Sequence, residues 1–147
     1  MKAFDTNVLV YAHRADMPFH GVARSLVKAQ AESGDAWAIP WPCIHEFYSI
    51  VTNPKIFKRS ASTPDQAIAQ IEAWLASPSL ELLAEPDDYA VVLLRLLAAS
   101  RARGPLVHDA RIVALCQARG VTTLVSADRD FSRIPGAVRI ENPFSAA

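Results

Sequence analysis

Short apolar runs alternate with longer segments of helical periodicity along this chain. Apolar runs bounded by glycine, proline or polar residues predict four or five strands, at 2–4, 36–40, 80–83, 121–125 and 138–140. The segments between them carry apolar residues at helical spacing. Because strands and helices alternate, the pattern predicts an α/β fold with a mostly parallel central sheet of four or five strands and helices on both faces.

Helix boundaries follow from capping and helix-breaking residues. First-turn prolines, the capping sequence Thr63-Pro64-Asp65-Gln66 and breaks at glycine predict helices that begin near residues 7, 18, 42, 63, 86 and 109. In the helix that begins at Pro18, we expect Val22, Leu26 and Ala29 to face the core.

The segment 89–102 is apolar almost all round, with Arg95 as its only charged residue before Arg101. A helix of this kind has to be buried on several sides. A domain of this size can bury such a helix in its own core, and a symmetric dimer can cover it equally well. Both arrangements are compatible with the sequence.

Length and composition indicate one globular domain over residues 1–147. Of these residues 51% are hydrophobic and 20% are charged, which is unlike a disordered chain. No apolar run is long enough to cross a bilayer and the N-terminus lacks signal-peptide features, so we expect a cytoplasmic protein with no membrane partner. Cys43 and Cys116 have no CxxC spacing, which favours reduced core thiols over a disulfide or a zinc site.

Four acidic residues fall where predicted strands or helices begin or end. Asp5 follows the first strand, Asp128 follows the fourth, and Asp109 and Glu46 lie in the first turns of helices. Ligands bind outside the carboxyl ends of the strands in open α/β sheets, so the four acids can meet at one edge. Local roles remain open for each acid taken alone: a helix cap for Asp5 or Asp109, a solvated surface for Glu46, and an Asx turn for Asp128 or Asp130.

A cluster of carboxylates raises the pKa of its members unless a cation neutralises it. Ligands that are all oxygen suit Mg²⁺ or Mn²⁺ rather than zinc. His45 and His108 adjoin two of the acids, but adjacent residues of a helix face different directions, so we do not expect them to be ligands. Ser126 can hydrogen-bond an acid or a metal-bound water, or serve only as a turn hydroxyl.

Together these segments resemble the PIN domain family, and most closely its VapC-type toxins. The matching residues are Asp5-Thr6-Asn7-Val8-Leu9-Val10-Tyr11-Ala12, Glu46, His108-Asp109-Ala110, Ser126-Ala127-Asp128-Arg129-Asp130-Phe131 and Asn142-Pro143-Phe144. The resemblance implies a Mg²⁺- or Mn²⁺-dependent endoribonuclease, the toxin of a bacterial toxin–antitoxin pair, which is inhibited by an antitoxin and commonly dimeric. It also implies that a set of four catalytic, metal-binding acids is supported by three polar residues: Asp5, Glu46, Asp109 and Asp128, with Asn7, Ser126 and Asp130.

Single residues argue against two other functions. A phosphatase with a nucleophilic aspartate needs a second carboxylate two residues after Asp5, where Asn7 stands. A phosphate-accepting receiver module needs a lysine after a late strand, and no lysine follows Lys58. A catalytically inactive PIN-like module that binds RNA remains an alternative, which a metal-dependent cleavage assay would separate from a nuclease.

Formal net charge is zero, so RNA has to be held by local patches or by metal ions. Basic side chains that surround Phe57 in a predicted loop over 55–62, and others beside the acidic residues, are candidates for this contact: Lys55, Lys58, Arg59, Arg129 and Arg133. Such cations bind phosphates, and an aromatic ring can stack on an unpaired base. Solvated loop charges around a core phenylalanine are the alternative.

Overall fold

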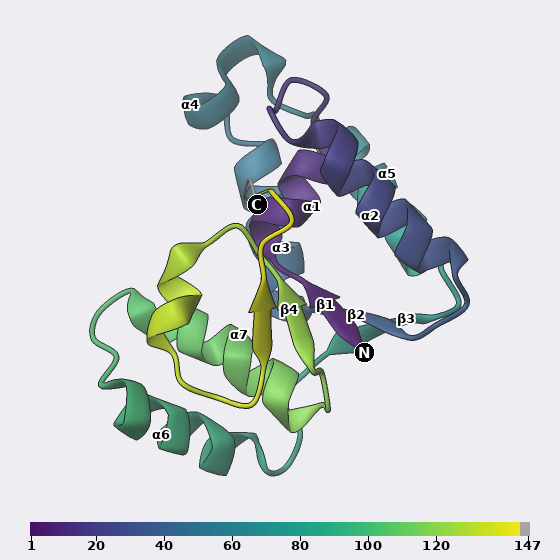
Figure 1. Cartoon of the computed structure of the whole chain (residues 1–147). Coiled ribbons are helices and arrows are strands. Elements are labelled where there is room, and N and C mark those ends of the chain that lie inside the picture. The colour runs from purple at the N-terminus through teal and green to yellow at the C-terminus, as the bar shows by residue number, and fades with distance from the viewer. Residues whose placement is uncertain (145–147) are drawn as a thin grey trace.

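Five parallel strands form the central sheet of the computed structural model, which describes residues 1–144 (Figure 1). They lie in the order β3-β2-β1-β4-β5, and every neighbouring pair is parallel. The predicted sheet is confirmed, including the last apolar run as its fifth strand. The bounds of β1 to β5 are Lys2–Phe4, Trp37–Pro40, Leu80–Leu83, Thr123–Val125 and Arg139–Glu141.

Helices cover both faces of this sheet. Strands β1 to β3 advance toward one edge, and the chain then returns across the sheet to β4 and β5. Right-handed crossovers therefore place the helices between β1 and β3 on one face and α6 and α7 on the other. Figure 1 shows α2 and α5 on the side opposite α6 and α7, and α4 beyond the carboxyl ends of the strands. The bounds of α1 to α7 are Thr6–His13, His20–Glu32, Trp41–Val51, Pro54–Phe57, Pro64–Leu75, Tyr89–Ser100 and Leu106–Ala118, and two short 3-10 segments are η1, Lys58–Ser60, and η2, Arg129–Arg133.

Aromatic side chains fill the core next to the site. Phe4 of β1 packs edge-on against Trp37 of β2, with ring centroids 5.9 Å apart. Phe47 of α3 is fully buried and packs against Trp74 of α5 with centroids 4.8 Å apart. Burial of Phe47 fixes the rotation of α3, which leaves its neighbour Glu46 on an exposed face of the helix.

The predicted core face of α2 is wrong by about a quarter of a turn. The residues that α2 buries are Ala23 and Val27, whereas Val22 is 48% exposed and Ala29 is exposed. Leu26 is half-buried at the border of this stripe. Ala23 and Val27 each follow a predicted core residue by one position, so the buried stripe is rotated by one residue along the helix.

Three predicted boundaries also shift. The predicted basic loop is helical, since Pro54 starts α4 and the Asn53 side chain caps it by accepting a 2.9 Å hydrogen bond from the Lys55 amide. The helix expected from Pro86 begins at Tyr89 after a turn. The helix expected from Asp109 begins three residues earlier, at Leu106, so this acid lies within its first turns.

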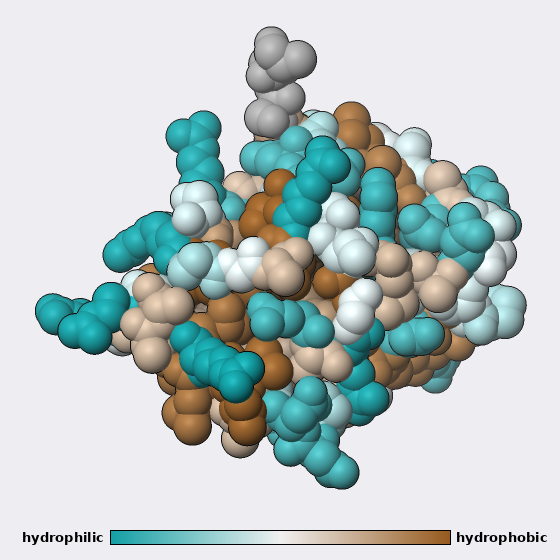
Figure 2. Space-filling view, turned by 60° about the horizontal axis from the view of Figure 1, so that its bottom comes forward, coloured by the Kyte–Doolittle hydropathy of each residue, from teal (hydrophilic) through white to brown (hydrophobic). Residues whose placement is uncertain are grey.

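Helix α6 buries only Leu96 completely, while Val91 is 52% and Leu94 65% exposed. The domain's own core therefore covers one side of this helix, where Tyr89, Val92, Leu93 and Leu97 pack against it, and leaves the other side exposed. Figure 2 shows a brown apolar area at the lower left, on the side of the molecule that carries α6. Across residues 1–144, no helix has both the length and the apolar character that crossing a membrane requires.

Candidate functional site

The pairing of β1 with β4 places Asp5 beside Ser126. Phe4 is in register with Val125, and the Asp5 amide donates a 3.0 Å hydrogen bond to the Val125 carbonyl. The Asp5 side chain is only 6% exposed, and burial raises its pKa although the hydrogen bond from Ser126 opposes that shift. Asp5 occupies the N-cap position of α1, but its side chain makes no capping bond. The role of a simple helix cap is thus excluded for Asp5.

Ser126 and Asn7 join the two strand ends around Asp5. The Ser126 hydroxyl donates to Asp5 Oδ2 at 2.7 Å and accepts from Asn7 Nδ2 at 3.3 Å and from the Asp128 amide at 3.0 Å. Asn7 also donates to Asp5 Oδ2 at 3.3 Å and accepts from the Ala127 amide at 3.1 Å. Ser126 is 1% exposed. These bonds fix the carboxylate of Asp5 and the start of the acidic loop as one unit.

Glu46 reaches the same edge from α3. Its Oε2 atom accepts a 2.8 Å hydrogen bond from the Thr6 hydroxyl, which ties the carboxylate to the first residue of α1. The negative charge of Glu46 contributes to the raised pKa of Asp5 and also to that of Asp109. Glu46 is thus exposed, as a solvated helix residue would be, while the Thr6 hydroxyl orients its carboxylate toward the acidic group.

The pKa of Asp109 is affected by all the other acids of the group. Burial, followed by the charges of Asp128, Asp5, Asp130 and Glu46, raises the pKa of Asp109 to about 6. The N-terminal end of α7 favours a negative charge at this position, but the effect is smaller than burial and repulsion together. The charges of four other carboxylates thus act on Asp109: those of Asp5, Glu46 and Asp128, which were expected to meet it at this edge, and that of Asp130.

Three of the five acids have oxygen atoms close enough to share one ion. One carboxylate oxygen from each of Asp109, Asp128 and Asp130 lies within 4.8 Å of the other two. Asp128 also accepts a 2.8 Å hydrogen bond from the Asp130 amide, so its turn-forming role coexists with its place in the cluster. The donors are all carboxylate oxygens, which fits Mg²⁺ or Mn²⁺. Asp130, expected to act through a water, belongs to this group of three, whereas Asp5 and Glu46 do not.

The histidines and cysteines stay outside this cluster. His45 and His108 are exposed, and neither belongs to the group of acids that can share an ion. Cys43 and Cys116 are buried free thiols, as expected. Burial raises the pKa of Cys43 well above its usual value and that of Cys116 to about 12, so both stay protonated. The Cys43 thiol donates a 3.5 Å hydrogen bond to Asp5 Oδ1.

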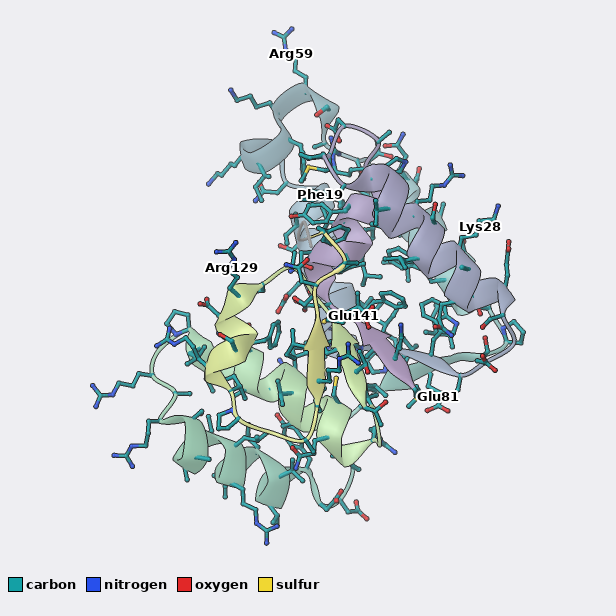
Figure 3. All side chains as sticks on the ribbon, in the orientation of Figure 1. Phe19, Lys28, Arg59, Glu81, Arg129 and Glu141 are labelled. Atoms are coloured by element: carbon teal, nitrogen blue, oxygen red, sulfur yellow. The ribbon has the colours of Figure 1, made fainter. Side chains whose placement is uncertain are left out.

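The basic candidates lie in two separate places. Arg129 and Arg133 belong to η2, directly after Asp128. Figure 3 shows Arg59 pointing outward at the end of the molecule that carries α4, and Arg129 near the carboxyl edge of the sheet. One face of the Phe57 ring is covered by the Arg14 guanidinium, 3.6 Å from the ring centroid, so that face is closed to a stacking base.

Sequence reasoning missed two residues that position the acids. Thr6 holds Glu46, and Cys43 contributes a thiol donor to Asp5. Thr6 lies inside the matched motif, but its partner is 40 residues away and no local pattern pairs them. Cys43 was expected only as a core thiol. Both bonds depend on how α1 and α3 pack.

The chain matches the PIN domain family over residues 2–137. Ribonuclease VapC48 of Mycobacterium tuberculosis is 33% identical over 144 residues, which cover 98% of each chain. Ribonuclease VapC43 of the same species is 33% identical over 133 residues, covering 90% of this chain and 89% of the relative.

Solved structures of the same fold include a VapBC2 complex from Rickettsia felis bound to a promoter DNA fragment. Its matching chain has a TM-score of 0.67 at 20% identity and covers 96% of this chain and 97% of its own length. M. tuberculosis VapC20, described as a Sarcin-Ricin loop cleaving toxin, has a TM-score of 0.66 at 18% identity, with coverage of 95% and 99%.

The fold and the acidic edge therefore define a PIN domain, and the chain belongs to the PIN domain family. Within that family, the relatives to which it is similar over nearly its whole length are VapC ribonucleases. The resemblance expected from the motifs is confirmed.

The raised pKa of Asp109 predicts a pH-dependent gain in stability for Asp109→Asn in EDTA. An acid whose pKa is raised by folding, here from 3.8 to about 6, makes the fold less stable as pH rises through that interval. Asparagine stays neutral, so the variant should gain on the order of 1 kcal/mol over the parent between pH 5 and pH 7.5, a figure reduced for solvent screening. Urea denaturation at both pH values measures it. An equal stability difference at the two pH values would contradict this assignment.

Proposed function

We propose that this protein is a metal-dependent endoribonuclease, the toxin of a bacterial toxin–antitoxin pair, which acts in the cytoplasm. The convergence of five interacting carboxylates at one edge of a PIN domain, with three of them able to share an ion, carries the proposal. The ribonuclease names of its relatives support the same activity. No side-chain nucleophile is needed, since hydrolysis of a phosphodiester in such a site uses water.

Asp5, Asp109 and Asp128 would hold Mg²⁺ or Mn²⁺, and Asp130 lies close enough to Asp109 and Asp128 to join them. When bound, such an ion lowers the pKa of water and stabilises charge on phosphoryl oxygens. Glu46 orients or deprotonates the attacking water, and Thr6 holds the Glu46 carboxylate in place. Ser126 and Asn7 keep Asp5 in a fixed orientation toward the other acids.

RNA is held by local basic side chains beside the acidic edge and on the α4–η1 segment. Arg129 and Arg133 flank the carboxylates, and their guanidinium groups suit phosphate oxygens. The exposed cations on the α4–η1 segment extend this contact along the RNA: Lys55, Lys58 and Arg59. Phe57 offers at most the ring face that Arg14 leaves open.

Asp5→Asn and Asp109→Asn should each lower RNA cleavage with Mg²⁺ or Mn²⁺ by about 100-fold or more, because each removes a charged ligand. Cleavage of labelled single-stranded RNA measures the rate, and circular dichroism checks the fold. EDTA should stop cleavage by the parent protein. Raising the metal concentration should not rescue the double variant.

Asp87→Asn is the matched control, because Asp87 is an exposed acid in the turn before α6. It should cleave at the parent rate. If either site variant also keeps the parent rate, the ligand assignment is wrong. If the parent binds RNA and cleaves none with either ion, the inactive RNA-binding alternative replaces the nuclease.

We also propose an antitoxin partner, on the basis of the VapBC complex that shares this fold. An apolar helix of the antitoxin would lie in a groove of the toxin, and a basic side chain of the antitoxin would enter the acidic edge in place of the metal. Expression of this chain alone should then slow growth, and a small protein encoded next to it should co-purify.

Inhibition by that partner should weaken as Mg²⁺ rises, since the partner and the ion compete for the same carboxylates. Cleavage rates at several Mg²⁺ and antitoxin concentrations measure the competition. Inhibition that does not change with the Mg²⁺ concentration would argue against entry of an antitoxin side chain into the acidic edge. If no protein co-purifies and expression does not slow growth, the toxin assignment is wrong, whereas the nuclease proposal still stands.

The exposed apolar face of α6 supports a homodimer that covers Val91 and Leu94. Leu94→Glu should convert a dimer to a monomer at micromolar concentration, because it would bury an unpaired charge in the interface. Sedimentation velocity measures the change. Ile68→Glu, at a similarly exposed apolar residue of α5, is the control and should leave the dimer intact. A parent protein that sediments as a monomer excludes the dimer.

A further inference from the structure

A cavity of about 530 Å³ adjoins the acidic edge between the loop that follows α6 and the segment η2. Asp109 and Asp130 line one part of it, and three arginines line the rest: Arg101, Arg103 and Arg133. Its size lies within the range of pockets that hold small ligands. The cavity therefore shares two of its residues with the cluster that can hold an ion and adds a set of cations beside them.

The three guanidinium groups have no partner among residues 1–144. None of them makes a hydrogen bond or an ion pair, although two carboxylates line the same cavity. The carboxylates instead converge on one another, with oxygens within 4.8 Å. Cations and anions in this cavity thus stand side by side without neutralising each other, which leaves the arginines available to a bound anion.

Arg101 adopts a backbone conformation that favours glycine. Its φ is 55°, in the left-handed region, where a Cβ atom is costly. This residue ends α6 and turns the chain toward Arg103 and Leu106 at the mouth of the cavity. A glycine would make the same turn at less cost, whereas the arginine adds a guanidinium group to the lining of the cavity.

We infer that this arginine-lined cavity binds a backbone phosphate of the RNA strand, next to the phosphodiester that lies at the carboxylates. This inference rests on the proposed nuclease function. Guanidinium groups bind phosphate oxygens in paired hydrogen bonds. An ion on the carboxylates would leave the arginine charges unopposed, so the cavity would become more attractive to a polyanion when the site is loaded.

The double variant Arg103→Gln/Arg133→Gln should bind a mixed-sequence single-stranded RNA about tenfold more weakly at low salt. Fluorescence anisotropy in EDTA measures the affinity without cleavage. The slope of log affinity against log salt should fall by about 0.7 for each phosphate that the variant no longer neutralises. In cleavage with Mg²⁺, KM should rise more than kcat falls, because the arginines position the strand away from the reacting atoms.

Arg24→Gln/Lys28→Gln removes the same charge from α2 and is the matched control. Figure 3 shows Lys28 on the side of the molecule away from Arg129. This control should keep both the affinity and the salt slope of the parent. Arg101→Gly should bind RNA more weakly while resisting urea at least as well as the parent, because glycine relieves the strained turn. A purely structural arginine would instead leave RNA affinity unchanged.

The outcomes separate this inference from the nuclease function. If the parent cleaves RNA but the double variant keeps its affinity and salt slope, the cavity does not bind the strand and the nuclease stands. If the arginine variants lose affinity but the parent cleaves nothing with Mg²⁺ or Mn²⁺, the phosphate site stands and the nuclease fails. Equal losses in the α2 control would show nonspecific attraction and overturn the phosphate site.

Discussion

Mutual repulsion among carboxylates is the constraint on which this site depends. Five acids meet at one edge of the sheet, and within residues 1–144 none of them is paired with a cationic side chain. Burial and repulsion raise the pKa of Asp109 to about 6. A fold keeps such an arrangement only if packing elsewhere offsets its cost, or if a bound cation neutralises it.

The packing that holds it is the pairing of β1 with β4 and the set of hydrogen bonds at its end. Ser126 and Asn7 satisfy Asp5 and the start of the acidic loop at once, so the loop cannot move without breaking several bonds. The hydrogen bonds of Asn7 explain why an asparagine, and not a second carboxylate, stands two residues after Asp5. An amide can both donate and accept here, whereas an ionised carboxylate could only accept.

Acidic and basic side chains form two separate groups around the site. The acids gather where an ion would sit, and the arginines of η2 and of the loop after α6 stand beside them without closing ion pairs. A chain with zero net charge can in this way present both a cation site and a phosphate site. Val91 and Leu94, the exposed apolar residues of α6, are not among the residues that line this cavity, although the last residue of the helix, Ser100, is.

The sequence by itself determined the fold class, because strands that alternate with helices build a parallel sheet. It also indicated the edge at which Asp5 and Asp128 lie, because parallel strands end at a common edge. The order of the strands came from the structure. Tertiary packing decided the rest. The rotation of α2 depended on close contact with α1, and the exposure of α6 depended on how little of it the core could accept.

Contacts between residues far apart in the chain could not be predicted from the sequence either. The bond from Thr6 to Glu46 spans 40 residues, and Asp130 entered the ion-sharing group only because the acidic loop turns through η2. The arginine-lined cavity combines the end of α6, the loop that follows it and the segment η2. Only Asp109 and η2 lie in or beside the matched motifs, so Arg101 and Arg103 could not be assigned to the site from the sequence. Local patterns encode which residues begin and end an element, whereas the direction of a side chain between elements is set by packing.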